Sequence, residues 1–347
     1  MPSVLVCSFN VEWMNDWFTT DAEPAAFRDS FTRDGHTSDT AETATRTAGV
    51  IRAIDPDVLA IAEGPSRPDE LQLFIDEYLT DDGQPRYSFF LSDTGAQQRV
   101  GLLYKPGSVD AAQLAPHADV ENMIDPWLAD VDGVAKLDLY HFTRTPLVVN
   151  LTIGGRSLQV IVMHTKSNFI NGGREMWEDP AQRQSYVEVA LKNRRRISTE
   201  GMRVRTYLDA RLGADVTAPI IVLGDLNDGP GLDYFEELYL SHNVTDILVG
   251  SAFEPEWLFA HAQHDVQAAD RYTAVFDDFV TGENGKHVLL DHILLSPGLN
   301  SSGAGLRKVA GSGAVRHVEY EAEVVNGGVN REDRPSDHRP VTVELQY

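Results

Sequence analysis

The stretch that decides the fold is Pro219-Ile220-Ile221-Val222-Leu223-Gly224-Asp225-Leu226-Asn227-Asp228, followed by Gly229-Pro230-Gly231. Its apolar, largely β-branched run is too short for a helix and predicts a strand that is buried on both faces. The strand delivers a carboxylate and an amide, Asp225 and Asn227, onto a loop restricted by glycine and proline, and loops of this kind often carry function. On this stretch alone, a structural strand followed by an Asx-type turn is the better interpretation.

Composition limits the classes of function. The chain has 347 residues and a formal net charge of −24, from 53 acidic and 29 basic residues. This charge repels polyanions, although screening beyond about 8 Å leaves local charge to decide what binds. The single cysteine, Cys7, excludes an internal disulfide framework. No apolar run reaches the roughly 18 residues of a membrane span, and the N-terminus lacks a signal-peptide pattern, so we expect a soluble cytoplasmic protein.

The chain shows no repeat and no low-complexity linker, so we expect one domain over residues 1–347. Two segments are interpreted as insertions: the aromatic-rich residues 14–40 and the irregular, acidic residues 107–140. The apolar runs 147–153 and 158–163 flank Gly154-Gly155 and predict a hairpin.

The longest helix is predicted over residues 181–212, where apolar residues recur at helical spacing. Arg194 is the basic residue that falls within this apolar stripe. Four basic residues lie on the opposite side, and we interpret them as a solvated outer face in preference to a phosphate-binding patch: Lys192, Arg195, Arg196 and Arg203.

Several apolar strands end in, or carry, an isolated polar residue of a catalytic type. Each has a structural interpretation of its own, such as a strand-end cap, a turn residue or a satisfied core histidine. Asp291, which we place in the middle of a strand over residues 288–295, is harder to explain in that way, because a carboxylate in an apolar strand is costly unless a partner such as histidine neutralises it. One shared site explains the whole set better than separate coincidences: Asn10, Glu63, His164, Asp225 with Asn227, Asp291, and Asp337 with His338.

The order of these motifs resembles the endonuclease/exonuclease/phosphatase superfamily of metal-dependent phosphoesterases. The resemblance covers essentially the whole chain, and Gly-Asp-x-Asn and the terminal Ser-Asp-His-x-Pro are its most specific motifs. It implies a four-layered α/β sandwich, in which two packed β-sheets are flanked by helices and the site lies at one end of the strands. The matching segments are Ser8-Phe9-Asn10-Val11, Ile61-Ala62-Glu63, Val100-Gly101-Leu102-Leu103-Tyr104, His164-Thr165-Lys166-Ser167, Gly224-Asp225-Leu226-Asn227, Leu290-Asp291-His292-Ile293 and Ser336-Asp337-His338-Arg339-Pro340.

The resemblance also implies roles. Glu63 would be the principal metal ligand, with Asn10 beside it and Asp337 a further ligand. An oxygen-rich set without cysteine suits Mg²⁺ or Mn²⁺ better than zinc. Asp225 would orient or deprotonate the attacking water and Asn227 would hold the phosphoryl group. Asp291 would fix and charge His338, and His164 would contact the phosphoryl oxygens or the leaving group.

The chain departs from the family pattern at Ala62, where many members carry glutamine. Four residues are candidates for contacts with substrate phosphates, against the alternative that they pair with surface carboxylates: Arg99, Lys166, Asn168 and Arg174.

We therefore expect a divalent-metal-dependent phosphodiester hydrolase acting by water attack on a phosphoryl centre. Within the resemblance, a nuclease is favoured, because His164-Thr165-Lys166-Ser167 differs from the phosphatase signatures of the family. A small or lipid-derived phosphoester is the alternative favoured by the net charge and the absence of a basic groove. A non-catalytic binding protein on the same fold is disfavoured, because every chemical position keeps a competent residue. We expect His338→Ala and Asp225→Asn each to remove activity at a nearly unchanged melting temperature. Substrate identity, the number of metals and the oligomeric state stay open.

Overall fold

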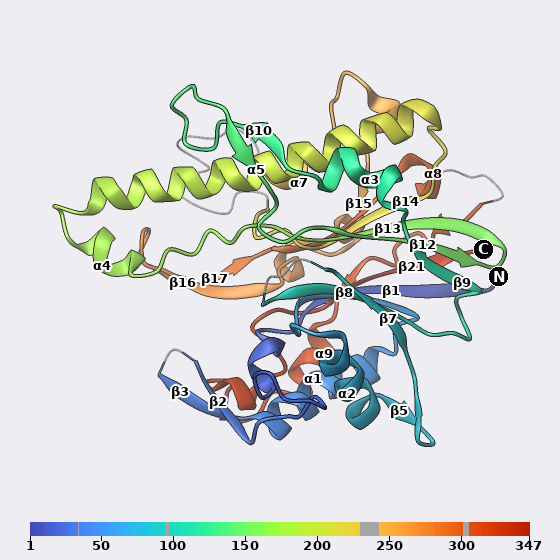
Figure 1. Ribbon diagram of the computed structural model, residues 1–347, viewed down its shortest axis with the longest axis horizontal. Coiled ribbons are helices and arrows are strands. Elements are labelled where there is room, and N and C mark those ends of the chain that lie inside the picture. Colours follow the sequence, from blue (N-terminus) through green and yellow to red (C-terminus); the bar gives the residue numbers. More distant parts are fainter. Residues whose placement is uncertain (34, 94–96, 230–242, 301–304) are drawn as a thin grey trace.

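A computed structural model shows four layers, with two β-sheets packed face to face and helices on both outer faces (Figure 1). The structure describes residues 1–33, 35–93, 97–229, 243–300 and 305–347. The predicted four-layered α/β sandwich is therefore confirmed. Pro230 and Gly231 of the predicted loop lie outside the described residues.

The first sheet has the strand order β19-β21-β1-β4-β8-β7, with β20 also paired to β21. Strand β1 is parallel to β4 and antiparallel to β21. The C-terminal ends of β1 and β4 therefore meet the start of β21 at one edge, away from the two chain termini. The strands are β1 (Ser3–Asn10), β4 (Val58–Gly64), β7 (Ser88–Leu91), β8 (Arg99–Tyr104), β19 (Arg307–Lys308), β20 (Ala314–Val315) and β21 (Val341–Gln346).

The second sheet has the order β15-β18-β14-β13-β12-β9. Strand β14 is parallel to β13 and antiparallel to β18, so Asp225 pairs with His164 on one side and with Asp291 on the other. The predicted hairpin is confirmed, because β12 and β13 pair antiparallel around Gly154-Gly155. The strands are β9 (Ala111–Leu114), β12 (Leu147–Ile153), β13 (Arg156–His164), β14 (Ile220–Asp225), β15 (Ala260–His261) and β18 (Asp291–Leu295).

The prediction of one strand over residues 288–295 is wrong. Strand β17 (Glu283–Val288), which pairs with β16 (Ala274–Asp278), ends at Val288, and β18 begins at Asp291. Asp291 thus starts a strand instead of lying inside one. The apolar Leu289 and Leu290 hide this break from a hydrophobicity pattern, because both are buried although they belong to neither strand.

Alternation of side chains separates the two sides of each sheet. In β1, Val4 and Val6 face the core between the sheets, whereas Cys7 and Phe9 face the helix layer. In β4, likewise, Ala60 faces the inter-sheet core. Both sides are apolar, which is why these strands are continuous hydrophobic runs in the sequence.

Helices α1 and α2 pack on the outer face of the first sheet, and α3, α5 and α7 pack on the second. The long helix predicted over 181–212 is confirmed as α5 (Arg183–Ala214). Asp39 caps the start of α1, and the residue after the helix, Asp55, adopts a left-handed conformation before Pro56. The bounds are α1 (Thr40–Ile54), α2 (Pro68–Tyr78), α3 (His117–Ile124), α4 (Gly173–Glu178), α5, α7 (Val244–Val249), α8 (Pro297–Asn300) and α9 (His317–Glu321).

The outer face of α5 is less solvated than the helical pattern indicated. Lys192 forms an ion pair with Asp132 at 2.5 Å, and Arg195 donates to the Asp132 carbonyl at 3.2 Å. Arg203 donates to the Met123 carbonyl at 3.2 Å. These residues hold the segment 107–140 against the helix, and that segment is structured, with β9, α3 and the hairpin of β10 (Trp127–Ala129) and β11 (Asp138–Tyr140).

The segment 14–40 contributes to the core beside α1 and α2. Trp17, Phe18 and Phe31 are buried there. Its regular elements are a 3₁₀ helix, η1 (Met14–Trp17), and the hairpin of β2 (Ser30–Arg33) and β3 (His36–Asp39). Shorter elements elsewhere are β5 (Thr80–Asp81), β6 (Gln84–Pro85), η2 (Pro255–Trp257), η3 (Ala262–Asp265), η4 (Ala268–Asp270) and η5 (Arg331–Asp333).

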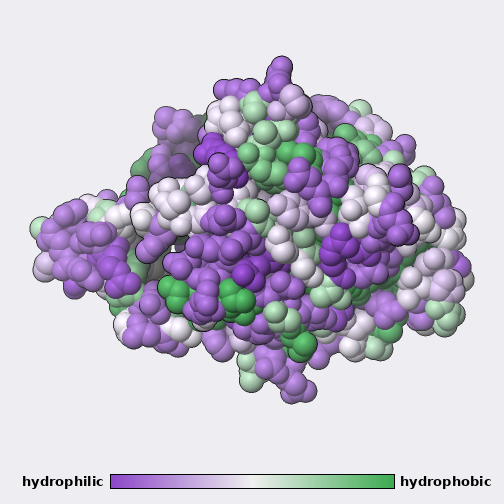
Figure 2. Space-filling model, turned by 90° about the horizontal axis from the view of Figure 1, so that it is seen from below, coloured by the Kyte–Doolittle hydropathy of each residue, from purple (hydrophilic) through white to green (hydrophobic). Residues whose placement is uncertain are grey.

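The face seen from the side of α1 and α2 is predominantly hydrophilic, with small separate apolar patches (Figure 2). This surface agrees with the strongly negative net charge of the chain. Within the described ranges, no helix combines the length and the apolar character needed to cross a membrane.

Candidate active site

The predicted site residues meet at the edge of the sandwich where β1, β4, β13 and β14 end. Asn10, His164 and Asp225 are the last residues of their strands, Asp291 is the first residue of β18, and Asp337 and His338 precede β21. Both sheets therefore contribute. The side chains of Asn10, His164, Asp225 and Asp291 are at most 2% exposed.

Gly224 allows Asp225 to reach this position. Its φ is +140°, and a Cβ atom there would lie 1.8 Å from the Met163 carbonyl oxygen of β13. The close approach of β13 to β14 therefore requires glycine. This is a physical reason for the glycine in the Gly-Asp-x-Asn motif.

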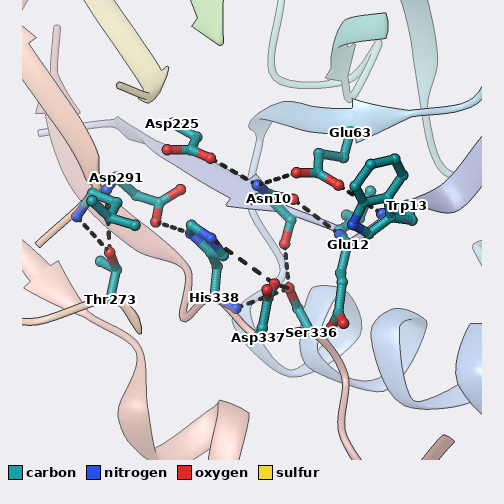
Figure 3. A network of polar contacts seen from close by, with 12 residues as sticks. Asn10, Glu12, Trp13, Glu63, Asp225, Thr273, Asp291, Ser336, Asp337 and His338 are labelled. Atoms are coloured by element: carbon teal, nitrogen blue, oxygen red, sulfur yellow. Dashed lines mark hydrogen bonds and ion pairs between the residues drawn. The ribbon is translucent and has the colours of Figure 1, made fainter. Parts of the chain in front are cut away.

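Asn10 joins the two carboxylates of the centre (Figure 3). Its Nδ2 donates to Asp225 Oδ2 at 2.9 Å and lies 3.3 Å from Glu63 Oε1, while its Oδ1 accepts from the Glu12 amide at 3.0 Å. The Asn10 side-chain amide thus contacts Glu63 of the first sheet and Asp225 of the second sheet. Ser336 secures the end of β1 by donating to the Asn10 carbonyl at 2.7 Å.

Glu63 is redirected toward the centre by its backbone. Regular alternation would send it to the helix side with Leu59 and Ile61, but its φ is +57° and the pairing of β4 with β8 shifts register there. Glu63 Oε2 accepts from the Trp13 amide at 3.0 Å and from Gln98 Nε2 at 2.8 Å. Burial, reinforced by Asp337 and Asp225, raises the pKa of Glu63 to about 7.

Asp225 is held by the loop that follows it. The Asn227 amide donates to Asp225 Oδ1 at 2.8 Å, and the left-handed φ of Asn227, +49°, turns the chain back for this contact. Burial raises the pKa of Asp225 to about 6; the charge of His338 opposes this shift and Asp291 adds to it. A carboxylate with a pKa in this range can accept a proton near neutral pH.

His338 is the charged histidine of the site. Its Nδ1 lies 2.6 Å from Asp291 Oδ2, and its Nε2 lies 3.9 Å from Asp337 Oδ1. Burial lowers the pKa of His338, but Asp291, Asp337 and Asp225 together outweigh this and raise it well above the usual value. The predicted pairing of Asp291 with a histidine is present, and the protonated ring presents Nε2–H toward the centre.

His164 is the neutral histidine. Its Nε2 lies 3.6 Å from Asp225 Oδ2 and 3.9 Å from Glu63 Oε1. Burial, Arg144 and His338 hold the pKa of His164 well below its usual value. The site therefore contains one histidine that donates as a cation and one that stays uncharged.

The donor set fits a divalent cation that prefers oxygen ligands. Two groups of side chains have ligand atoms within 4.8 Å of one another, Glu63–His164–Asp225 and Asp225–Asp291–His338. Burial, with neighbouring carboxylates, raises the pKa values of Glu63 and Asp225, so a bound cation would stabilise their charged forms. In the described part of the chain, the buried Asp291 Oδ1 also has no hydrogen-bond partner. Asp337 belongs to neither group.

The predicted substrate-binding residues separate into two sets. Asn168 donates through Nδ2 to the Asn227 carbonyl at 3.0 Å, and Lys166 follows His164 closely, with its Nζ on the Ser167 carbonyl at 2.6 Å. Arg99 instead contacts the Ser92 carbonyl at 3.2 Å. Arg174 lies on α4, 3.9 Å from Glu178 and over the ring of Phe279.

Sequence reasoning missed Gln98 and Arg144. Arg144 donates from Nη2 to Gln98 Oε1 at 2.6 Å and from Nη1 to the Thr165 carbonyl at 3.1 Å. Arg144 therefore links Gln98, which donates to Glu63, to the loop after His164. It also places a cation near Glu63 and Asp225. Arg144 lies before β12 and Gln98 directly before β8, and neither belongs to the sequence motifs that identified the other residues.

Comparison with known proteins agrees with this architecture. The chain matches the family model described as "Endonuclease/Exonuclease/phosphatase family" over residues 7–338. It is similar to D. rerio TDP2 complexed with single strand DNA product, with a TM-score of 0.51 and 14% identity over 100% of both chains. It is also similar to truncated Caenorhabditis elegans TDP2, with a TM-score of 0.52 and 13% identity over 99% of this chain and 98% of that one.

A third similar structure is the endonuclease/exonuclease/phosphatase from Bacteroides vulgatus, with a TM-score of 0.50 and 13% identity over 100% of this chain and 99% of that one. At such identities the likeness concerns the fold. Comparison with curated proteins gave no match.

Proposed function

This chain belongs to the endonuclease/exonuclease/phosphatase family, and we propose that it is a divalent-metal-dependent phosphodiester hydrolase. The observation that carries the proposal is the cluster of half-buried Glu63 with buried Asn10 and Asp225, which faces the His338–Asp291 pair. A carboxylate pair with raised pKa values beside a protonated imidazole suits water attack on a phosphoryl centre, because the reaction needs a proton acceptor and cationic stabilisation of phosphoryl oxygens.

Mg²⁺ or Mn²⁺ is the cofactor that we propose, because the oxygens are hard donors and the described part of the site holds no thiolate. Glu63 would hold it, with Asp337 as a further ligand. Asn10 would contribute Oδ1, which accepts one backbone amide and keeps a second lone pair. When bound, the cation would polarise a phosphoryl oxygen and neutralise charge in the transition state.

The side chains of this chain supply the remaining functions. Asp225 orients the attacking water and accepts its proton, helped by a pKa of about 6. Asn227, anchored by its contacts with Asp225 and with the Thr165 carbonyl, holds a phosphoryl oxygen. His338 donates Nε2–H to the charge that develops on the phosphoryl group, and Asp291 keeps that ring oriented and protonated. Neutral His164 contacts the same oxygens or the leaving group.

A nuclease-like substrate has the stronger support. Lys166 and Asn168 follow His164 on a loop that contacts Asn227, and the next residue, Phe169, is a large aromatic side chain that is 75% exposed. A cation and an exposed aromatic ring beside a phosphodiester site suit a single strand, whose bases stack on such rings.

Two other functions are alternatives to a nuclease. A small or lipid-derived phosphoester is favoured by the net charge of −24, which repels a polyanion. A non-catalytic binding protein is disfavoured by the complete set of acid, base and charged groups in the site.

The test measures hydrolysis of a single-stranded oligonucleotide, supercoiled plasmid and bis(p-nitrophenyl) phosphate in Mg²⁺, Mn²⁺ and EDTA. D. rerio TDP2 was solved with single strand DNA product, which sets the order of testing. We expect metal-dependent cleavage that is absent in Asp225→Asn. Phe169→Ala should weaken oligonucleotide cleavage and leave bis(p-nitrophenyl) phosphate unchanged. Cleavage of the small diester alone would move the proposal to a small substrate, and no hydrolysis of any substrate would contradict it.

A further inference from the structure

A buried chain of side chains outside the reacting groups connects two loops of the site. His292 Nε2 lies 2.7 Å from the Asp228 carbonyl oxygen, and His292 Nδ1 lies 2.7 Å from His261 Nε2. The Asp228 carboxylate forms an ion pair with Arg194 of α5 and accepts from the Val244 amide of α7 at 2.8 Å. The side chains of this series are all buried, and that of His292 is 0% exposed: Arg194, Asp228, His261 and His292.

The contacts determine the tautomer of each ring. A carbonyl oxygen only accepts, so His292 Nε2 must carry the hydrogen. Burial lowers the pKa of His292 to about 4, so the ring is neutral and its Nδ1 is an acceptor. His261 Nε2 must then donate, and His261 Nδ1 accepts from the Gln263 amide at 3.2 Å. Each of these three contacts then has one donor and one acceptor.

Two members of this series are next to catalytic positions. Asp228 follows Asn227 directly, and His292 follows Asp291, which pairs with Asp225 across β14 and β18. The packing is tight: a Cβ atom on Gly229 would lie 2.2 Å from the Leu289 carbonyl and 3.3 Å from the His292 ring. A displaced His292 ring would therefore release the far side of the Asp225–Asp228 loop.

We propose that His292, kept in one neutral tautomer by His261, is a positioning residue that holds the Asp225–Asp228 loop in register with Asp291. The proposal rests on the proposed function only for its kinetic consequence. Independently of any activity, the hydrogen bond from the Asn227 backbone amide to Asp225 should depend on the donor Nε2–H of His261. In metal sites, loss of a side chain that orients the residues of the site typically costs about 10- to 100-fold in metal affinity or activity.

Three variants separate this role from simple packing. His261→Leu fills much of the space but removes the donor to His292. His261→Gln restores a donor through its amide nitrogen and an acceptor through its amide oxygen. His264→Leu is the matched control, because the His264 ring stacks on His261 with centroids 5.0 Å apart but has no bond to His292.

The first measurement is independent of activity. Long-range ¹H–¹⁵N spectra of the full chain should show Nε2–H tautomers for His292 and His261, and amide exchange should be followed at Asn227 with Leu223 as an internal reference. We expect His261→Leu to accelerate exchange at Asn227 about 10-fold relative to Leu223, and His261→Gln and His264→Leu to match the unmodified chain. Unchanged exchange in a folded His261→Leu, or equally fast exchange in His261→Gln, would overturn the proposal.

The second measurement is the split between kcat and KM on bis(p-nitrophenyl) phosphate. A misplaced loop should lower kcat of His261→Leu about 10-fold or more at a nearly unchanged KM, with recovery in His261→Gln. Equal kcat values in both variants would also overturn the proposal. If the unmodified chain shows no hydrolysis, the proposed function fails, while the exchange experiment still decides whether His292 positions the loop.

Discussion

The middle of strand β14 and its last residue are equally buried but opposite in chemistry. Leu223 and Asp225 are two residues apart and lie on the same face of the sheet, and their exposures are 0% and 1%. Leu223 belongs to the inter-sheet core, whereas Asp225 contacts Asn10 and Asn227. The same change from apolar to polar occurs along β13, from Val162 to His164.

This difference shows that the same sheet supplies the apolar core in its middle and the candidate active site at its edge. In the middle of the sandwich, apolar side chains are satisfied by packing alone. At the edge, polar side chains need hydrogen-bond partners; those of Asp225 and Glu63 have them, yet burial raises the pKa of both carboxyl groups. The site therefore holds free energy that a ligand can recover, which is typical of functional centres and absent from the core.

The largest expected effect concerns Asp225. Asp225→Asn should lower kcat by about 10²- to 10⁴-fold, because the proton acceptor is lost. Stability should change little, since less repulsion between the two carboxyl groups is offset by a side-chain NH2 that faces the Asn10 and Asn227 donors in place of an acceptor. Steady-state kinetics and thermal melting measure both.

The matched control for Asp225→Asn is Leu223→Ala in the same strand. It should cost about 2 to 5 kcal/mol of unfolding free energy, as buried leucine truncations do, while the folded fraction keeps its kcat. A stable Leu223→Ala, or a strongly destabilised Asp225→Asn, would contradict the view that Leu223 contributes to stability and Asp225 to activity.

The sequence predicted a nearly unchanged melting temperature for His338→Ala, but the structure predicts a lower one. Asp291 is 0% exposed and pairs with His338, so the variant leaves a buried carboxylate without its cation. We expect a loss of about 3 to 5 kcal/mol in unfolding free energy, together with loss of activity. Urea titration measures the stability, and the double variant His338→Ala with Asp291→Asn should recover part of it. If the single variant melts with the unmodified chain, Asp291 is not a buried charge.

The smallest expected effect is the pH dependence of stabilisation by metal. Glu63 and Asp225 have folded-state pKa values of about 7 and about 6, above those of the unfolded chain. The folded state therefore holds these protons more tightly, and the stability they contribute at low pH is lost as pH rises through about 6 to 7. A divalent cation competes with the protons, so the rise in Tm on adding Mg²⁺ should grow from about pH 5 to about pH 8.

Glu63→Gln is the control for this pH dependence. It removes the ionisable group that the cation would replace, so the Mg²⁺-induced rise in Tm should become smaller and less dependent on pH. The same rise in Tm at both pH values in the unmodified chain would show that the carboxylates do not bind the cation.

Most of the centre was predictable because strand ends are visible in a sequence. Asn10, His164, Asp225 and Asp291 each continue the inward row of an apolar strand, and period-two alternation together with strand polarity places them at one edge. Glu63 was identified by its place at the end of an apolar run, although alternation alone would direct it to the helix side; the left-handed backbone that redirects it is not visible in the sequence.

The sequence by itself determined the apolar strands, the long helix α5 and the residues that end the strands, because these depend on hydrophobic periodicity and local backbone preference. The packing of the strands into two sheets was implied by the family resemblance. Only the tertiary structure decided that Gln98 and Arg144 support Glu63, that β18 begins at Asp291, and that His261 and His292 support the Asp228 loop. These contacts join segments far apart in the chain. Their partners are selected by close packing and by the cost of an unpaired buried polar group, and neither leaves a periodic signal in the sequence.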